Sequence, residues 1–291
     1  MAVMTVRDRA GLDRSSSSGG LTQSVEMDGA EIRFGVSGSG ERTLLLVHGH
    51  QANAAWWHAV APRLEQRWRV VRLDLSGHGD SGHRAGGYGD GAVWLEEVHA
   101  VLAASGTHEA VLVGHSMGGR IALASAVARP QGVLGVIALD SVLRAVPVSA
   151  RAGWHPERRP RVRATLAEAL GRFRLAPAQP DPAEEVLAVV AEGSIRSEAD
   201  GWTWKYDQRG LPGVGARHVE DRLGELSVPV RFVHAELSPL VGEDAVDLLR
   251  ARVPAQQVET VEMAGVHHHL ILDAPQRCAR LIDELATGLR G

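Results

Sequence analysis

Five short apolar runs, spread along most of the 291-residue chain, constrain its fold more than any other feature of the sequence. Each run has apolar residues at consecutive positions and ends at a polar or glycine-rich turn. Strands of this kind are buried on both faces, which is typical of parallel sheets whose two sides are covered by helices. The five runs are Thr43–Val47, Arg69–Leu75, Ala110–Val113, Val133–Leu139 and Val230–His234.

Helical stretches alternate with these runs, and an antiparallel hairpin is expected before them. Helices are predicted at Trp57–Gln66, Ala92–Ala104, Met117–Ala128 and Pro275–Leu289. The hairpin would join Gln23–Met27 to Glu31–Ser37 through the tight-turn dipeptide Asp28-Gly29. The alternation predicts an α/β fold with a mostly parallel central sheet flanked by helices.

The alternation stops between about Arg144 and Ser227, where Pro, Arg and Glu become frequent and no strand run is evident. Helical pieces are expected there near Ala164–Arg172 and Ala183–Ala191. We therefore expect a helical cap at 144–226, inserted between the two parts of the core at 21–143 and 227–291. Residues 1–20 are charged and then serine- and glycine-rich, which predicts a disordered tail.

Composition excludes several functional classes. The net charge of −4 provides no broad basic field for nucleic acid. The apolar runs are much shorter than the roughly 20 residues of a membrane span. The single cysteine, Cys278, excludes a disulfide framework and a zinc site built from cysteines. Because no apolar stretch follows the basic N-terminus, no secretory signal is expected and the predicted location is cytoplasmic. The sequence carries no signal for the oligomeric state.

One candidate nucleophile lies in Gly114-His115-Ser116-Met117-Gly118, between an expected strand and an expected helix. Glycines on both sides of a serine permit the strained backbone of a strand-to-helix turn that exposes the hydroxyl. The helix N-terminus beneath it stabilises negative charge. We predict that Ser116 is a nucleophile; the alternative is a glycine-rich turn with an unused serine.

Donors for an oxyanion are expected at two turns. The backbone N–H of Met117, the residue after the nucleophile, would supply one of them. The second would come from His50 or Gln51 in His48-Gly49-His50-Gln51, where a glycine at the strand end lets the backbone approach a reacting oxygen. The alternative for this second segment is an ordinary strand-end turn.

A base for the serine is expected in the run His267-His268-His269, late in the chain. The run could also suggest a metal, but no carboxylate lies at ligand spacing near it, so neither a metal nor a cofactor is predicted. The segment Gly77–Gly82 formally fits a dinucleotide-binding motif. That motif requires a helix to begin next, and the four glycines of 83–91 prevent one.

Together these motifs resemble those of the α/β-hydrolase fold superfamily. The matching segments cover about 23–143 and 227–290, and they occur in the family's order. They are His48-Gly49 with Trp56-Trp57, Asp74-x-x-Gly77-His78-Gly79-x-Ser81, the Gly114–Gly118 turn, and the histidine run before Asp273-x-Pro275. The resemblance implies that family's fold, with the insertion in the place of its helical cap.

The resemblance also implies two further catalytic residues. The family's histidine lies five residues before the acidic residue of the closing motif, which selects His268 by counting back from Asp273. The family's usual acid position, after the strand Val230–His234, is occupied by Ser238. Asp140, at the end of the preceding strand, and Glu236 remain as alternatives, and we favour Asp140 because a strand-end carboxylate is better placed.

The predicted function is a serine hydrolase with a Ser116–His268–Asp140 triad. It would cleave a small-molecule carboxylic ester, lactone or thioester through an acyl-enzyme. Two alternatives stay open: a hydrolase of carbon–carbon bonds in diketones with the same triad, and a ligand-binding member of the fold without hydrolytic activity.

Tryptophans are concentrated around the expected site. Five of the seven lie beside the oxyanion segment or in the cap, which predicts a tryptophan-walled substrate pocket, although each could belong to the core. The seven arginines between Arg151 and Arg174 are interpreted as a solvated face rather than as an anion site. The predicted pocket residues are Trp56, Trp57, His115, Trp154, Trp202, Trp204 and His267.

Overall fold

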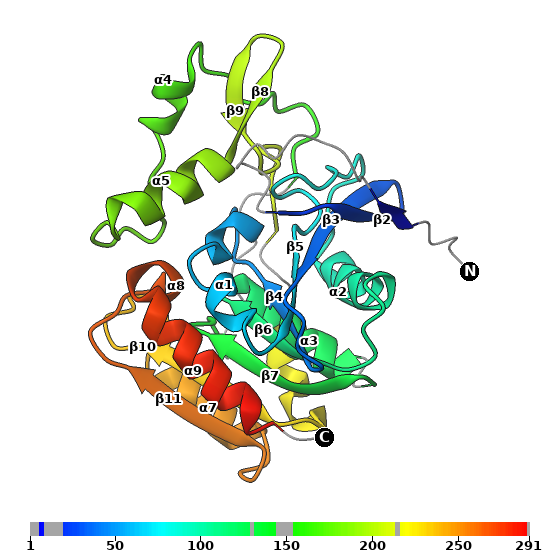
Figure 1. Ribbon diagram of the computed structural model, residues 1–291, viewed down its shortest axis with the longest axis vertical. Helices are drawn as coiled ribbons and strands as arrows, with labels where there is room; N and C mark the ends of the chain where they lie inside the picture. Colours follow the sequence, from blue (N-terminus) through cyan, green and yellow to red (C-terminus); the bar gives the residue numbers. More distant parts are fainter. Residues whose placement is uncertain (1–5, 9–19, 129–130, 144–153, 213–215, 290–291) are drawn as a thin grey trace.

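The computed structural model of the chain describes residues 6–8, 20–128, 131–143, 154–212 and 216–289. Within these ranges a nine-stranded sheet forms the centre of the molecule (Figure 1). The first three pairs in its spatial order, up to β3 with β5, are antiparallel, and all pairs from β5 to β11 are parallel. The mostly parallel α/β fold predicted from the sequence is confirmed. In spatial order the strands are β1 (Val6–Asp8), β2 (Gln23–Met27), β3 (Ala30–Ser37), β5 (Arg69–Leu73), β4 (Thr43–Val47), β6 (Ala110–His115), β7 (Val133–Leu139), β10 (Val230–Ala235) and β11 (Val258–Met263).

The central strands are apolar at consecutive positions because each supplies both hydrophobic cores. In β4, Leu45 and Val47 face one core, whereas Leu44 and Leu46 face the other. All four side chains are fully buried. Burying one such side chain contributes about 1.5–3 kcal/mol, so the sheet has a strong preference for this register.

Helices cover both faces of the sheet, as Figure 1 shows. Residues of the first group share one core, and residues of the second group share the other. The first group is α2 (Ala92–Ala104), α3 (Met117–Ala128), α6 (Ala216–Arg222) and α7 (Glu243–Arg252). The second group is the short 3-10 helix η1 (Ala54–Trp57), α1 (Ala61–Leu64), α8 (Leu270–Asp273) and α9 (Pro275–Thr287).

The predicted helix at Trp57–Gln66 is instead divided into η1 and α1. The Asn53 side chain accepts a hydrogen bond from Ala55 N, which begins η1 three residues earlier than predicted. Proline near the start of α1 then favours a separate beginning for that helix, because its missing N–H is not needed there.

The inserted segment contains strands that the sequence did not indicate. Besides α4 (Leu166–Leu170) and α5 (Glu184–Gly193), it holds a hairpin of β8 (Ile195–Glu198) and β9 (Gly201–Trp204). The expectation of no strand there is therefore wrong. Figure 1 shows these four elements as a lobe apart from α9 and β11, and α5 contacts η1 of the core.

The structure describes only some residues of the predicted cap and of the predicted N-terminal tail. Within the range predicted as cap, α6 and the 3-10 turn η2 (Leu223–Glu225) contact α3 of the core. Of the predicted tail, the described residues are Val6–Asp8, which pair with β2, and Gly20. The remaining tail residues and Arg151 lie outside the described ranges.

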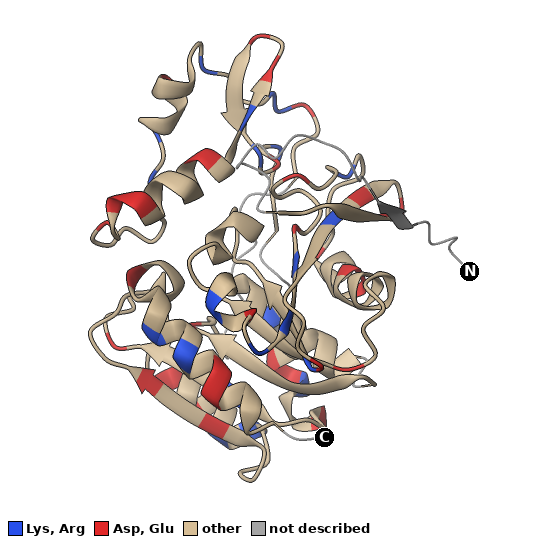
Figure 2. Cartoon of the chain, viewed as in Figure 1, with Lys and Arg blue, Asp and Glu red and all other residues tan. Residues whose placement is uncertain are grey.

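Charges of both signs are dispersed over the chain, including the lobe that carries α4 and α5 (Figure 2). Among the helices that the structure describes, none combines the length and the apolar character needed to cross a membrane.

Candidate active site

Ser116 lies at a sharp turn between β6 and α3. Its φ of +55° is a left-handed conformation that non-glycine residues seldom adopt, and its N–H donates to Leu139 O at 2.8 Å. The flanking glycines are required by close backbone contacts. A Cβ on Gly114 would lie 2.2 Å from the carbonyl group of Gly118, and one on Gly118 would lie 2.2 Å from Val47 O. The predicted strand–serine–helix turn is present, and its strain is held by tight packing.

His268 and Asp140 are brought together from positions far apart in the sequence. His268 Nδ1 donates to Asp140 Oδ2 at 2.7 Å, and both side chains are buried. Asp140 follows β7 with a φ of +44°, and its N–H donates to Val233 O at 2.7 Å. Because Nδ1 carries the proton, Nε2 of His268 is left unprotonated and can act as a base.

Two further donors hold the Asp140 carboxylate. Ala235 N donates to Oδ1 at 2.8 Å, and Ser238 Oγ donates to Oδ2 at 2.6 Å. Ser238 occupies the position where the family pattern has its acid, and here it supports the carboxylate that contacts the histidine. The other candidate, Glu236, is exposed and accepts a hydrogen bond from Gly265 N at 2.7 Å.

His48 orients the segment in front of the nucleophile. Its Nε2 accepts from Leu75 N at 3.1 Å, so Nδ1 carries the proton and donates to Gly49 O at 2.8 Å. Burial lowers the pKa of His48 to about 4, and the ring is neutral at physiological pH. A Cβ on Gly49 would lie 3.4 Å from Ser116 Cβ, so this backbone closely borders the nucleophile.

The two residues expected to supply oxyanion donors adjoin this point. Met117 is the first residue of α3, directly after Ser116. His50 follows Gly49 directly and is exposed. Gln51 has a left-handed φ of +59°, so the backbone turns at this residue.

A second anchor joins the segment after Gln51 to the loop after β5. The buried Asp74 carboxylate accepts hydrogen bonds from Ala54 N and Asp80 N, each at 2.7 Å. Burial raises the pKa of Asp74 to about 7. Lys205, the only lysine of the chain, lies in the inserted segment and contacts Asp80 at 2.8 Å. These contacts connect the inserted segment to the loops that border Ser116.

Three buried histidine rings gather beside the site, and we call His115, His268 and His269 the His cluster. The ring centroids of His268 lie 5.0 Å from His115 and 4.8 Å from His269. His115 Nε2 donates to His268 O at 2.9 Å, and its Nδ1 has no hydrogen-bond partner among the described residues. The ring of His269 makes no hydrogen bond of good geometry in the same ranges, but the backbone carbonyls of Ala176 and Pro177 lie close enough to it to act against the lowering of its pKa.

The two outer rings of the His cluster are neutral. Burial lowers the pKa of His115 to about 3, with a smaller contribution from the nearby His268. Burial also lowers the pKa of His269, and the neighbouring histidines add to this. The sequence indicated His115 only as a pocket residue and His269 only as a neighbour of the expected base, since nothing in the local spacing connects the two.

His267, which was predicted to line the pocket, is held by the carboxylate of Asp273. Its backbone N–H and its Nδ1 lie 2.8 and 3.2 Å from Asp273 Oδ2. Gln179 of the inserted segment reaches the same carboxylate and also accepts from His269 N at 2.9 Å. Asp273 therefore positions the histidine run, and Gln179 connects that run to the inserted segment.

A series of aromatic rings leads from the hairpin to the His cluster. Trp204 of β9 lies 6.2 Å from Phe173, which lies 6.5 Å from Trp56, which lies 5.2 Å from His269, all between ring centroids. Two of the predicted pocket tryptophans, Trp56 and Trp204, thus belong to this series of ring contacts. Phe173 was not among the predicted pocket residues.

The other three tryptophans have different surroundings. Trp57 is fully buried in the core under β4. Trp154 packs beside Gly87, with the Arg209 guanidinium 5.6 Å from its ring centroid. Trp202 exchanges backbone hydrogen bonds with Arg163 at 2.8 Å.

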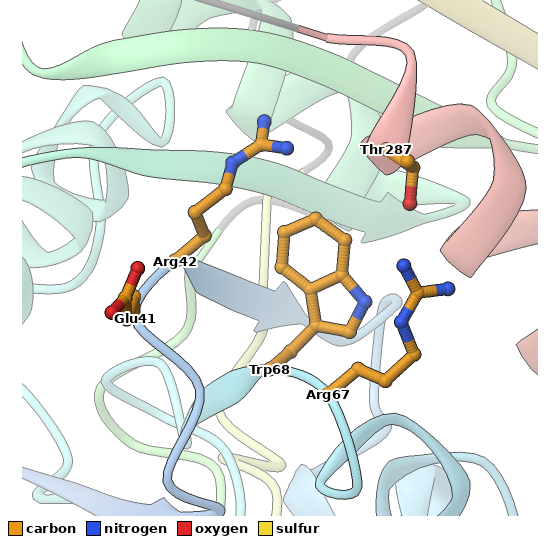
Figure 3. A pocket seen from close by; sticks show the side chains of 5 residues that line it. All are labelled: Glu41, Arg42, Arg67, Trp68 and Thr287. Atoms are coloured by element: carbon orange, nitrogen blue, oxygen red, sulfur yellow. The ribbon is translucent and has the colours of Figure 1, made fainter.

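A separate hollow of about 280 Å³, whose lining side chains are shown in Figure 3, lies at the end of the sheet where β4 begins, opposite the end where Ser116 lies. It adjoins Arg42, before the first residue of β4, whereas Ser116 follows the carboxyl end of β6. The guanidinium of Arg42 stacks 5.0 Å above Trp68, and Arg67 pairs with Asp283 at 2.6 Å. These side chains hold α9 on the sheet, so the hollow has a structural explanation. Its lining residues are Glu41, Arg42, Arg67, Trp68 and Thr287.

The chain is similar to known proteins over most of its length. Pimeloyl-(acyl-carrier protein) methyl ester esterase of Aeromonas hydrophila is 30% identical over 254 residues, covering 82% of this chain and 93% of that protein. The enzyme of the same name from Yersinia enterocolitica is 26% identical, covering 88% of this chain and 97% of its own. The solved thioesterase domain from the curacin biosynthetic pathway superposes with a TM-score of 0.74 at 24% identity, covering 97% of this chain and 99% of that domain.

The sequence profile of the alpha/beta hydrolase family matches residues 44–281, which include β4 except its first residue, the Ser116 turn, Asp140 and the His cluster. More than half of the chain is covered by this match. The chain belongs to the alpha/beta hydrolase family.

Proposed function

We propose that the protein is a carboxylic ester hydrolase in which Ser116 is the nucleophile, His268 the general base and Asp140 the acid. The observation that carries the proposal is the 2.7 Å contact between His268 Nδ1 and Asp140 Oδ2, next to a strained serine at the head of α3. Such a contact leaves Nε2 free to accept a proton from a serine hydroxyl.

In the proposed reaction Ser116 Oγ attacks the ester carbonyl carbon and His268 Nε2 takes its proton. The N–H groups of Met117 and His50 stabilise the oxyanion, and Asp140 stabilises the imidazolium that forms. The tetrahedral intermediate then collapses, and the alcohol leaves with the proton from His268. Water, deprotonated by the same imidazole, releases the acid and restores the serine.

Three features support a hydrolytic role over a purely ligand-binding one. Asp140 accepts three hydrogen bonds, so its carboxylate is held in one orientation. Ser116 and Asp140 each have a positive φ, and such backbone strain in non-glycine residues is concentrated at functional sites. The sequence relatives that match most of the chain are named as methyl ester esterases.

For the substrate, we propose an ester on an acyl chain, a methyl ester above all. The names of the relatives motivate the methyl ester and the carrier-bound chain. The ring series from Trp204 through Phe173 to Trp56 offers an apolar surface for such a chain. Thioesters and lactones are proposed as related substrates, because their hydrolysis also requires attack by the serine on a carbonyl carbon and stabilisation of an oxyanion.

The test compares wild-type protein with Ser116→Ala on a panel of nitrophenyl esters, acyl methyl esters free and carrier-bound, a lactone, a thioester and a diketone. We expect the wild-type protein to hydrolyse esters. The Ser116→Ala variant should do so at least about 10³-fold more slowly, because it lacks the nucleophile of the triad. Ser197→Ala, a change at an exposed serine of β8, is the matched control and should retain full activity.

Labelling with a fluorophosphonate separates the remaining alternatives. An activated serine reacts with the probe, whereas a ligand-binding protein without one does not. Diketone cleavage without ester turnover would overturn the proposed bond specificity, and an unlabelled Ser116 would overturn the mechanism itself.

A further inference from the structure

The His cluster has the donor set of a transition-metal site. His115, His268 and His269 each offer a ring nitrogen, and the three atoms lie within 4.8 Å of one another. The side chains are buried. Three imidazoles with an open fourth position are a recurrent ligand set for Zn²⁺. The histidine run alone does not reveal this ligand set. Its third member, His115, is the last residue of β6 and directly precedes Ser116, far from the run in the sequence.

Free ring nitrogens remain after the hydrogen bonds of the cluster are assigned. Nδ1 of His268 is bound to Asp140 and Nε2 of His115 to His268 O, which leaves His268 Nε2 and His115 Nδ1. Neither nitrogen of His269 makes a hydrogen bond of good geometry in the described ranges, although the carbonyls of Ala176 and Pro177 lie near the ring. Buried polar atoms without partners are uncommon in folded proteins, and a bound ion is one explanation for them.

The groups behind two of the rings are those found behind metal-bound histidines. A ligating imidazole commonly donates its other N–H to a carboxylate or a backbone carbonyl, which fixes its tautomer. Asp140 does this for His268, and the His268 carbonyl does it for His115. The arrangement that suits His268 to act as a base is therefore also one that suits a metal ligand.

The geometry requires only a small closure. Zn–N bonds of about 2.1 Å in a tetrahedral site place ligand nitrogens about 3.4 Å apart. The cluster atoms, within 4.8 Å now, would have to move inward by roughly an ångström or less each. One point borders both the cluster and the nucleophile: a Cβ on Gly49 would lie 3.3 Å from His115 Nδ1 and 3.4 Å from Ser116 Cβ.

We propose that His115, His268 and His269 form a site for a divalent transition metal such as Zn²⁺, and that its occupation reversibly inhibits hydrolysis. The inhibitory part rests on the proposed function: an ion on His268 Nε2 removes the lone pair that must accept the Ser116 proton. Binding itself does not depend on catalysis. A fourth ligand, water or the Ser116 hydroxyl, would complete the tetrahedron.

The binding test is calorimetric titration of the chelator-treated full-length protein with ZnCl₂, repeated with Co²⁺ to record its visible absorption. We expect one ion per chain and a tetrahedral cobalt spectrum. His115→Phe and His269→Phe keep an aromatic ring while removing the nitrogens, and each should weaken binding by more than about tenfold, the lower limit for losing even a residue behind a ligand. His269→Gln serves as a second variant if a phenylalanine disturbs folding.

His108→Ala is the matched control, because it removes an exposed imidazole remote from the cluster and should leave affinity unchanged. Weak binding of several ions that the cluster variants do not alter would show surface adsorption and overturn the site.

The inhibition test measures nitrophenyl ester turnover against Zn²⁺, with reversal by EDTA. Inhibition should follow the calorimetric affinity, and the Zn²⁺ concentration for half inhibition should rise at least about tenfold in His269→Phe. Ser116→Ala separates the two proposals: it lacks turnover but should still bind one ion. If the wild type binds Zn²⁺ without any hydrolase activity, the proposed function fails and the site stands. If Zn²⁺ binds without inhibiting, or activates, the inhibitory role is wrong.

Discussion

The identity of the triad acid can be tested by Asp140→Asn, because the hydrogen bonds of this carboxylate define what an amide would disturb. Oδ1 accepts from Ala235 N, and Oδ2 accepts from His268 Nδ1 and Ser238 Oγ. In asparagine the amide oxygen can replace Oδ1, but the NH₂ group then faces two donors at the position of Oδ2. The imidazole can restore a hydrogen bond only by moving its proton to Nε2, where it can no longer accept one from Ser116.

The expected loss follows from this change of tautomer. Turnover of a nitrophenyl ester should fall about 10³- to 10⁴-fold, equivalent to about 4–5.5 kcal/mol of transition-state stabilisation. KM should change little, since Asp140 does not contact the substrate in the proposed reaction. Hydrogen bonds to a charged group contribute about 1.5–3 kcal/mol, so the thermal midpoint should be recorded to show that the variant is folded at the assay temperature.

Glu236→Gln is the matched control for this experiment. Glu236 is exposed, and glutamine retains an oxygen for the hydrogen bond from Gly265 N. We expect activity within about threefold of wild type, since exposed substitutions have small effects. The assignment would be refuted if the turnover of Asp140→Asn stayed within tenfold of wild type. It would also be refuted if Glu236→Gln lost as much turnover as Asp140→Asn.

Three other outcomes are expected. Adding Ser238→Asp to Asp140→Asn should restore at least about tenfold of the lost turnover, because position 238 lies 2.6 Å from the missing carboxylate oxygen; no gain would show that a carboxylate there cannot reach the imidazole. Cys278 should not react with Ellman's reagent at pH 8 until guanidinium chloride unfolds the chain, since burial raises the pKa of its thiol; rapid reaction of the folded protein would contradict this. Stability should fall as the pH drops from about 6.5 toward 4, because burial lowers the folded-state pKa of His48 to about 4 and of His115 to about 3, so at these two sites the unfolded chain binds protons first. Asp74, whose folded-state pKa is raised to about 7, offsets part of this loss over the same range. Urea midpoints against pH would measure this, and a flat profile would argue against buried neutral rings.

The core strands were predictable because their burial is complete. All five apolar runs match their strands β4, β5, β6, β7 and β10 to within two residues, and each of these strands supplies both cores. The strand β11 was not predicted. It lies at the edge of the sheet, and its sequence alternates apolar and charged residues of which only Met263 is buried.

The hairpin of the inserted segment escaped prediction for a related reason. β8 reads Ile-Arg-Ser-Glu, and only Ile195 is buried. Charged residues on a two-stranded hairpin resemble a loop in the sequence, since only packing against a neighbour shows which side is covered.

What the sequence determined by itself is the local part of the protein: the buried strands, the helices that cross between them, and the strained turn at Ser116. Short-range sterics and continuous burial produce these features, and both are visible within a window of about ten residues. Tertiary structure decided which side chains meet. It brought Asp140 rather than Glu236 to His268, made Ser238 a donor to that carboxylate, and placed His115 beside the histidine run. Such contacts join residues 98 to 153 positions apart, and they depend on strand order and register, which no local pattern encodes.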